Sequence, residues 1–214
     1  DSFAEVILKG IRFILIIVLP AAVGLCVLSK EILIVLFEWG SFGLSDVNAT
    51  VPILIIYSIA LPFYSITTYA VRCFYAGKDM QLPVRLSIWF LILNTVFSLL
   101  FMNVWGVYGL AFANLLSAIM HTFFIGKAMK DSYKISFSKG LKHLLVPIFV
   151  GLIVIALISL LGKGVVSYFD STHKMHAFIS VSVLIPLSVG AYFFVLQLFK
   201  ISDFSSIKLW KSNS

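Results

Sequence analysis

The sequence predicts an all-α fold, a polytopic membrane helix bundle with six transmembrane helices, and two observations lead to it. The 214 residues are 61% hydrophobic and only 12% charged, with a mean hydropathy of +1.07, whereas about a quarter of the residues in soluble domains are charged. A membrane-spanning helix needs about 20 mostly apolar residues, because about 30 Å of hydrocarbon is crossed at 1.5 Å per residue. Six apolar runs approach or exceed that length.

The first run covers residues 6–28. Residues 30–39 are also apolar but too few to span, so they predict an interfacial helix or an extension of the first helix. Ser45 or Asp46 is expected to be the N-cap of the second span. This second run covers 49–76.

Pro62 lies in the middle of that second run and should kink the helix, because proline removes a backbone hydrogen bond and its ring clashes with the preceding turn. The polar stretch 72–85 then reads as a tight turn between two spans. Gly77 is expected to end the helix in the left-handed conformation, Asp79 to cap the next helix, and Pro83 to occupy its first turn.

The other four runs follow in order along the chain, and Pro147 is expected to open the fifth. They cover residues 82–102, 109–129, 144–161 and 177–199. The connections between them are a very short turn at 103–108, the most basic loop at 130–142 and a polar loop at 162–174.

The loop charges predict the orientation. With six spans, thirteen of the sixteen Lys and Arg residues fall on one side, and only Lys30, Lys163 and Lys174 fall on the other. The thirteen are Lys9, Arg12, Arg72, Lys78, Arg85, Lys127, Lys130, Lys134, Lys139, Lys142, Lys200, Lys208 and Lys211. By the positive-inside rule, both ends of the chain are expected to be cytoplasmic.

Several classes of function are disfavoured. No Asp, Glu, Lys or Arg lies at the centre of a span, which argues against a proton relay and against catalysis inside the helices. We therefore expect no catalytic residues. His173 and His176 lack a third ligand, so we expect no metal site. No interleaving of aromatic and basic residues suggests nucleic acid.

Arg72, Lys78 and Arg85 form a candidate cytoplasmic cationic cluster. The simpler interpretation is that they set topology and contact lipid headgroups. The functional alternative is a gate that makes the first contact with an anionic substrate headgroup such as a pyrophosphate, which Arg and Lys suit.

Uncharged polar residues inside the third and fourth spans form a second candidate cluster. Asn94 and Ser98 share a helix face, and Asn114 and Ser117 lie a tight turn away. Together with the backbone carbonyl of Leu110, their oxygens would suit a small cation. The alternative is ordinary hydrogen bonding between helices, worth about 1 kcal/mol or less in membranes.

Four motifs, in this order, resemble one family. They are Leu-Pro-Ala-Ala-Val-Gly at 19–24, Leu-Phe-Glu-Trp-Gly-Ser-Phe at 36–42, Arg-Cys-Phe-Tyr-Ala at 72–76 and Gly-Val-Tyr-Gly-Leu-Ala at 106–111. The chain resembles the MurJ (MviN) lipid II flippases of the multidrug/oligosaccharidyl-lipid/polysaccharide exporter superfamily. Such proteins have fourteen helices, and the resemblance places this chain at about helices nine to fourteen, the C-terminal part.

The resemblance implies that two parts of the chain have different roles. Residues 1–130 would be a four-helix portion of the transporter core, and 131–214 would add two helices that border a groove for a lipid tail. The implied activity is movement of the undecaprenyl-pyrophosphate-linked peptidoglycan precursor across the bacterial inner membrane by alternating access. The implied partners are membrane lipids, lipid II and the missing N-terminal half of the same chain.

The resemblance also implies a possible sodium ion, and no other cofactor. The matching positions are Asn94, Ser98, Leu110 through its carbonyl, and Asn114, with Ser98 standing where such relatives carry an acidic residue. Two alternatives to the flippase remain: an exporter of another lipid-linked oligosaccharide or of drugs, and a non-transporting scaffold that docks a partner through 130–142. A membrane-embedded enzyme ranks last.

Overall fold

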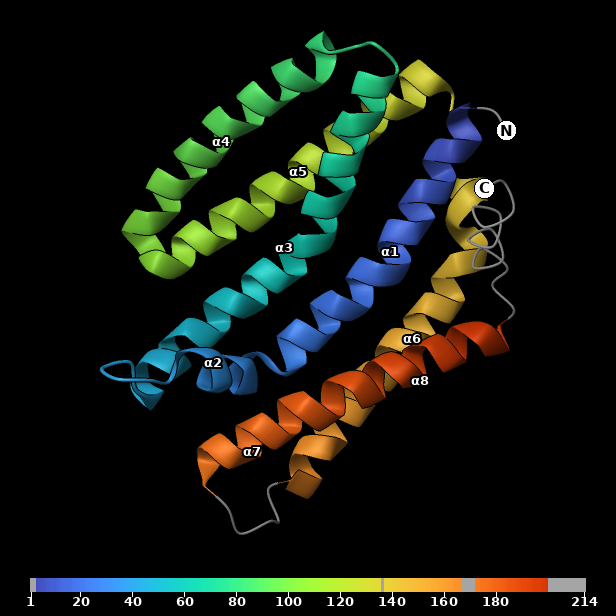
Figure 1. Ribbon diagram of the computed structural model, residues 1–214. Coiled ribbons are helices and arrows are strands. Elements are labelled where there is room, and N and C mark those ends of the chain that lie inside the picture. Colours follow the sequence, from blue (N-terminus) through green and yellow to red (C-terminus); the bar gives the residue numbers. More distant parts are fainter. Residues whose placement is uncertain (1–2, 136, 167–171, 200–214) are drawn as a thin grey trace, which may run out of the picture.

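The computed structural model describes residues 3–135, 137–166 and 172–199, and every regular element within them is a helix (Figure 1). The elements are α1 (Phe3–Val27), α2 (Ser29–Phe37), α3 (Leu44–Ala76), α4 (Gln81–Trp105), α5 (Val107–Tyr133), α6 (Phe137–Val166), α7 (His173–Ile179), the π-helix η1 (Ser180–Leu184) and α8 (Ile185–Leu198). Six stretches are long and apolar enough to cross a membrane, with α7, η1 and α8 forming the last, His173–Leu198. The prediction of six spans is confirmed.

The long helices follow one another as neighbours in the order α4, α5, α3, α1, α6, α8 (Figure 1). α1 lies in the middle of this series and contacts both α3 and α6. The last two spans therefore join the rest of the bundle chiefly through α1.

The short segment after α1 is a separate helix. α1 ends at Val27 and α2 begins at Ser29, so the two helices are divided by Leu28. α2 packs against α3 and α7. Of the two predictions for this segment, a distinct short helix is the one that the structure contains.

The N-cap of α3 is Gly43, so the expectation of Ser45 or Asp46 was wrong. Asp46 instead occupies the third helical position, and its carboxylate accepts a hydrogen bond of 2.9 Å from the Gly43 N–H. α3 changes direction near its middle in Figure 1, and it contains the expected Pro62. The missing proline N–H and the clash of its ring account for such a bend.

The turn between α4 and α5 consists of Gly106 alone, with φ = +58°. A Cβ on Gly109 would overlap the Phe101 carbonyl of α4. The expected tight turn and close helix packing are therefore both present, and each depends on a glycine.

Two loops are shorter than predicted. The basic region 130–142 is mostly helical, because α5 runs to Tyr133 and α6 begins at Phe137. α6 also continues to Val166, into the expected loop 162–174. Pro147 consequently lies inside α6 instead of opening it. Hydropathy reports the apolar part of a helix, whereas backbone hydrogen bonding continues into its polar ends.

The last span contains a π-helical turn, Ser180–Leu184, between α7 and α8. Pro186 follows it at the second residue of α8. A proline cannot donate the usual backbone hydrogen bond, and a π-turn is one of the ways in which a helix accommodates that loss.

Candidate functional site

The turn at 77–80 joins α3 to α4 at one end of the bundle. Gly77 has φ = −76°, so it is not left-handed as predicted; Lys78 is, with φ = +63°. The glycine is needed for a different reason, because a Cβ on Gly77 would overlap the Tyr133 hydroxyl of α5. The N-cap residue of α4 is Met80, but the expected capping contact is present, since Asp79 Oδ1 accepts a hydrogen bond of 3.3 Å from the Leu82 N–H.

Aromatic packing holds this end together. The Tyr133 ring lies 5.1 Å from that of Phe3 and 5.4 Å from that of Phe74, measured between ring centroids. Phe74 is fully buried in a cluster with residues of α1 and α5. The start of α1 and the ends of α3 and α5 therefore meet at one end, which we call the basic end.

The three cations of the candidate gate, Arg72, Lys78 and Arg85, are all exposed at the basic end. The structure gives none of them an ion pair within the described residues. They are therefore available to an anion from outside these helices. Their role as a gate stays a prediction. Lys200, Lys208 and Lys211, assigned to the same side, lie outside the described residues.

The candidate cation site is a hydrogen-bonded cluster centred on Asn114 of α5. Its Oδ1 accepts a hydrogen bond of 3.1 Å from Asn94 Nδ2 of α4, and its Nδ2 donates to the Tyr57 hydroxyl and to the Leu110 carbonyl, each at 3.1 Å. Tyr64 of α3 lies 3.4 Å from the same Oδ1. The tyrosines were not predicted, because only the fold brings α3 to the α4–α5 pair.

Ser98 lies one turn along α4 from Asn94 and takes no part in these hydrogen bonds. Ser117 Oγ is buried on α5 and has no hydrogen-bond partner among the residues that the structure describes. The cluster thus brings Asn94, Leu110 and Asn114 together, with their polar groups directed at one another. A sodium ion at these positions stays a prediction.

The opposite end of the bundle carries ion pairs, and we call it the paired end. Glu31 of α2 lies 2.9 Å from Lys163 Nζ of α6. The same Nζ donates a hydrogen bond of 2.5 Å to the Val27 carbonyl at the end of α1. Lys163 therefore satisfies a free carbonyl at a helix C-terminus and links α6 to α1 and α2.

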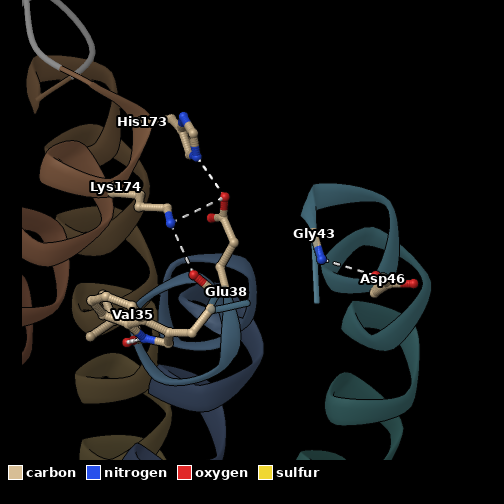
Figure 2. Close-up of polar contacts among 7 residues, drawn as sticks. Val35, Glu38, Gly43, Asp46, His173 and Lys174 are labelled. Atoms are coloured by element: carbon tan, nitrogen blue, oxygen red, sulfur yellow. Dashed lines mark hydrogen bonds and ion pairs between the residues drawn. The ribbon is translucent and has the colours of Figure 1, made fainter. Parts of the chain in front are cut away.

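Glu38 forms the second link at the paired end (Figure 2). Its Oε1 lies 2.8 Å from His173 Nε2 and 3.9 Å from Lys174 Nζ, and Lys174 also donates a 3.0 Å hydrogen bond to the Glu38 carbonyl. The Glu38 side chain is 9% exposed, and Lys174 Nζ lies 5.3 Å from the centre of the Trp39 ring. These contacts connect the end of α2 to the start of α7.

Sequence reasoning missed both links, although one signal was present. Glu31 and Glu38 flank the short apolar segment, and Lys163 and Lys174 were assigned to the same side of the membrane. His173, considered as a metal ligand, instead faces Glu38. Among the described residues, no group of three or more His, Cys, Asp or Glu side chains is arranged to hold a metal ion.

An apolar groove lies between α1, α6 and α8, and Ile32 of α2 also lines it. Its volume is about 460 Å³, and its lining residues are Ile17, Pro20, Ala21, Gly24, Leu25, Leu28, Ile32, Ile155, Ser159, Ile185, Ser188, Val189, Tyr192 and Phe193. The buried Tyr192 hydroxyl donates a hydrogen bond of 2.9 Å to the Ile16 carbonyl and so fixes α8 to α1. A Cβ on Gly24 would meet nothing within 4 Å, so the groove has room beside this glycine.

Six candidate spans, an apolar groove and exposed cations at one end define a polytopic membrane protein suited to amphipathic ligands. The family model described as "Lipid II flippase MurJ" matches residues 1–195. The chain belongs to the MurJ family, a family of lipid II flippases, and is a multi-pass protein of the bacterial inner membrane.

Individual relatives agree with this assignment. The chain is 35% identical over 121 residues to a probable lipid II flippase MurJ of Vibrio cholerae, covering 56% of this chain and 23% of the relative. It is 22% identical over 195 residues to the corresponding protein of Buchnera aphidicola subsp. Baizongia pistaciae, covering 91% of this chain and 38% of the relative. The chain thus spans about a quarter to two fifths of the length of the curated relatives it matches.

A solved structure of lipid II flippase MurJ in an inward closed conformation has the same fold. Its TM-score is 0.70 at 23% identity, and the match covers 93% of this chain and 42% of that one. The likeness supports the helical membrane fold predicted from the sequence. The division into 1–130 and 131–214 stays a prediction.

Proposed function

We propose that the chain is the C-terminal part of a lipid II flippase, which moves the undecaprenyl-pyrophosphate-linked peptidoglycan precursor across the bacterial inner membrane by alternating access. The observation that carries this proposal is the family match over residues 1–195. Its partners would be lipid II, the surrounding lipids and the N-terminal part of the same protein. It acts as part of a transporter and not as an enzyme.

The apolar groove between α1, α6 and α8 receives the lipid tail in this proposal. Its lining is almost entirely apolar, apart from the hydroxyls of Ser159, Ser188 and Tyr192. Ser159 and Ser188 lie 3.3 Å apart and pair with each other, and Tyr192 donates to Ile16. With these hydroxyls paired, a hydrocarbon chain in the groove leaves no polar group without a partner.

The pyrophosphate head needs a different path, because moving a bare charge into hydrocarbon costs many kcal/mol. Arg72, Lys78 and Arg85 make the first contact with it at the basic end. All three are exposed and lack ion pairs within the described residues, so an incoming phosphate replaces only water. The remainder of the polar path belongs to other parts of the protein.

Sodium coupling through Asn94, Ser98, Leu110 and Asn114 is a subsidiary proposal. Asn94 already donates to Asn114 Oδ1, and Asn114 donates to the Leu110 carbonyl. A cation would have to replace these donors, and Ser98 supplies a neutral oxygen. We therefore assign these residues first to contact between α4 and α5.

Complementation with the full-length protein tests the proposal. It is expressed in a bacterium whose own lipid II flippase can be switched off, and survival and outward-facing lipid II are scored. Gly24→Leu, which fills the groove, should abolish rescue. Gly190→Leu on α8 is the matched control, because its Cβ also meets nothing within 4 Å and Gly190 does not line the groove.

Rescue by the wild type and by Gly190→Leu, but not by Gly24→Leu, would support both the flippase and the groove. Lysis with the wild type, despite normal membrane insertion, would contradict the flippase and favour an exporter of another lipid-linked saccharide. Full rescue by Gly24→Leu would contradict the tail groove alone. A protein that inserts but affects no lipid-linked saccharide would favour the scaffold.

A further inference from the structure

A second apolar pocket lies near the basic end, away from the groove described above. Its volume is about 510 Å³, and α1, α3 and α5 form it. The lining is Ile11 and Leu15 of α1, Ile66 of α3, and Thr122, Phe123, Gly126, Lys127, Met129 and Lys130 of α5. It shares no residue with the groove between α1, α6 and α8.

The pocket has one polar edge. Lys127 and Lys130 are three residues apart on α5, so they lie on neighbouring positions of one face. Both are exposed, and the structure gives neither an ion pair within the described residues. The only other polar lining side chain, Thr122, is already engaged with the Ala118 carbonyl at 2.8 Å and with Thr67 Oγ1 at 2.9 Å.

The two lysines also lie at the depth of a headgroup. They are six and three residues from the end of α5 at Tyr133, which packs on Phe3 and Phe74 at the basic end. At 1.5 Å per residue, this places them within about 10 Å of the helix end. An apolar pocket with two exposed cations at its membrane-surface edge matches a molecule with hydrocarbon chains and an anionic head.

We propose that this pocket binds an anionic phospholipid, with an acyl chain against Ile11, Leu15 and Phe123 and the phosphate between Lys127 and Lys130. The apolar lining supplies affinity for the chain, and the lysines supply the preference for negative charge. The site holds a resident lipid that fills the space between α1 and α5. This inference is independent of which lipid-linked substrate the protein moves.

Photocrosslinking identifies the occupant. Phe123→p-benzoylphenylalanine preserves an aromatic side chain at a position that is 68% exposed and lines the pocket. The full-length protein is irradiated in nanodiscs of phosphatidylglycerol and phosphatidylethanolamine, and the adduct is identified by mass spectrometry. An adduct with the mass of phosphatidylglycerol is expected. A crosslink to another segment of the same protein, or adducts in proportion to the lipid mixture, would overturn the proposal.

Filling the pocket gives a second, independent measurement. A Cβ on Gly126 would meet nothing within 4 Å, and leucine favours helix over glycine, so Gly126→Leu should fold. It should remove the retained phosphatidylglycerol seen by native mass spectrometry. Gly190→Leu, at a glycine that lines neither pocket and whose Cβ also meets nothing within 4 Å, is the matched control and should retain it. Equal retention in both variants would contradict the proposed site.

The lysines are tested by lipid selectivity. Lys127→Gln and Lys130→Gln should each lower the preference for phosphatidylglycerol over phosphatidylethanolamine by about fivefold. Lys134→Gln, an exposed cation at the same end but outside the pocket, should leave this preference unchanged. An equal loss with Lys134→Gln would show general surface attraction and would overturn the assignment of a site.

Discussion

The two ends of the bundle are held together by different forces. At the basic end, the helices are joined by the packing of Phe3, Phe74 and Tyr133, while Arg72 and Lys78 stay outside that contact. At the paired end, carboxylates on α2 or just after it hold cations on α6 and α7. Charge at one end is available to ligands, and charge at the other end is used inside the molecule.

The difference shows how a membrane protein can connect helices without a hydrophobic driving force. Lipid tails are as apolar as the side chains they replace, so helix contacts depend on close packing and on polar bonds. Packing connects α1, α3 and α5. Ion pairs connect α6 and α7 to α1 and α2, and they leave an apolar groove between these elements.

The largest expected effect is at the basic end. Phe74→Ala should destabilise the protein by about 3 kcal/mol, because a fully buried ring is replaced by a cavity. Thermal unfolding in detergent measures the change. Phe149→Ala, at a position 66% exposed on α6, is the matched control and should leave stability unchanged. Equal stability in the two variants would show that packing does not hold the basic end.

An intermediate effect is expected at the paired end. Glu38→Gln should destabilise by about 1 kcal/mol, since its partners His173 and Lys174 are about half exposed and solvent screens the attraction. Combining it with His173→Gln should add little, because both changes break the same contact. Additive losses in this double-mutant cycle would mean that the two residues are not coupled.

The smallest effect on stability is expected from the exposed cations. Arg72→Gln, Lys78→Gln and Arg85→Gln should each change stability by less than about 0.5 kcal/mol, because the described residues give them no ion pair. The same variants should lower outward-facing lipid II in the complementation assay. Lys30→Gln, exposed at the paired end, is the control. Full transport by all three variants would show that the exposed cations at the basic end are not needed for the substrate, and the proposed difference between the two ends would be wrong.

Much of the fold could be predicted from the sequence, since hydrocarbon thickness fixes span length and glycine marks tight turns. The six spans, the Asp79 capping contact and the tight glycine turn all followed from such local rules, whereas the separate helix α2 was one of two alternatives. Helix ends did not. The polar region 130–142 reads as a loop because water and lipid headgroups accept charge, although its backbone is mostly helical.

The candidate sites show the same limit. Asn94 and Asn114 were predicted together because the very short turn expected at 103–108 makes the third and fourth spans neighbours, and the two side chains do form a hydrogen bond. Lys163 and its hydrogen-bond partner Val27 are 136 residues apart, and nothing in the local sequence selects that pairing. Gly77 illustrates the same point, because its requirement comes from Tyr133 on another helix and not from its own backbone angle.

The π-turn at Ser180–Leu184 determines in which direction the side chains after it point, relative to those before it. Ala177 before it is buried against α2, and Tyr192 after it is buried against α1. Each residue in an α-helix advances the side-chain direction by about 100°. Deleting one residue from this turn would therefore rotate Tyr192 out of line with Ile16 while Ala177 stayed in place. The number of residues between these two positions is fixed by geometry, so a one-residue insertion or deletion between them should break one of the two contacts.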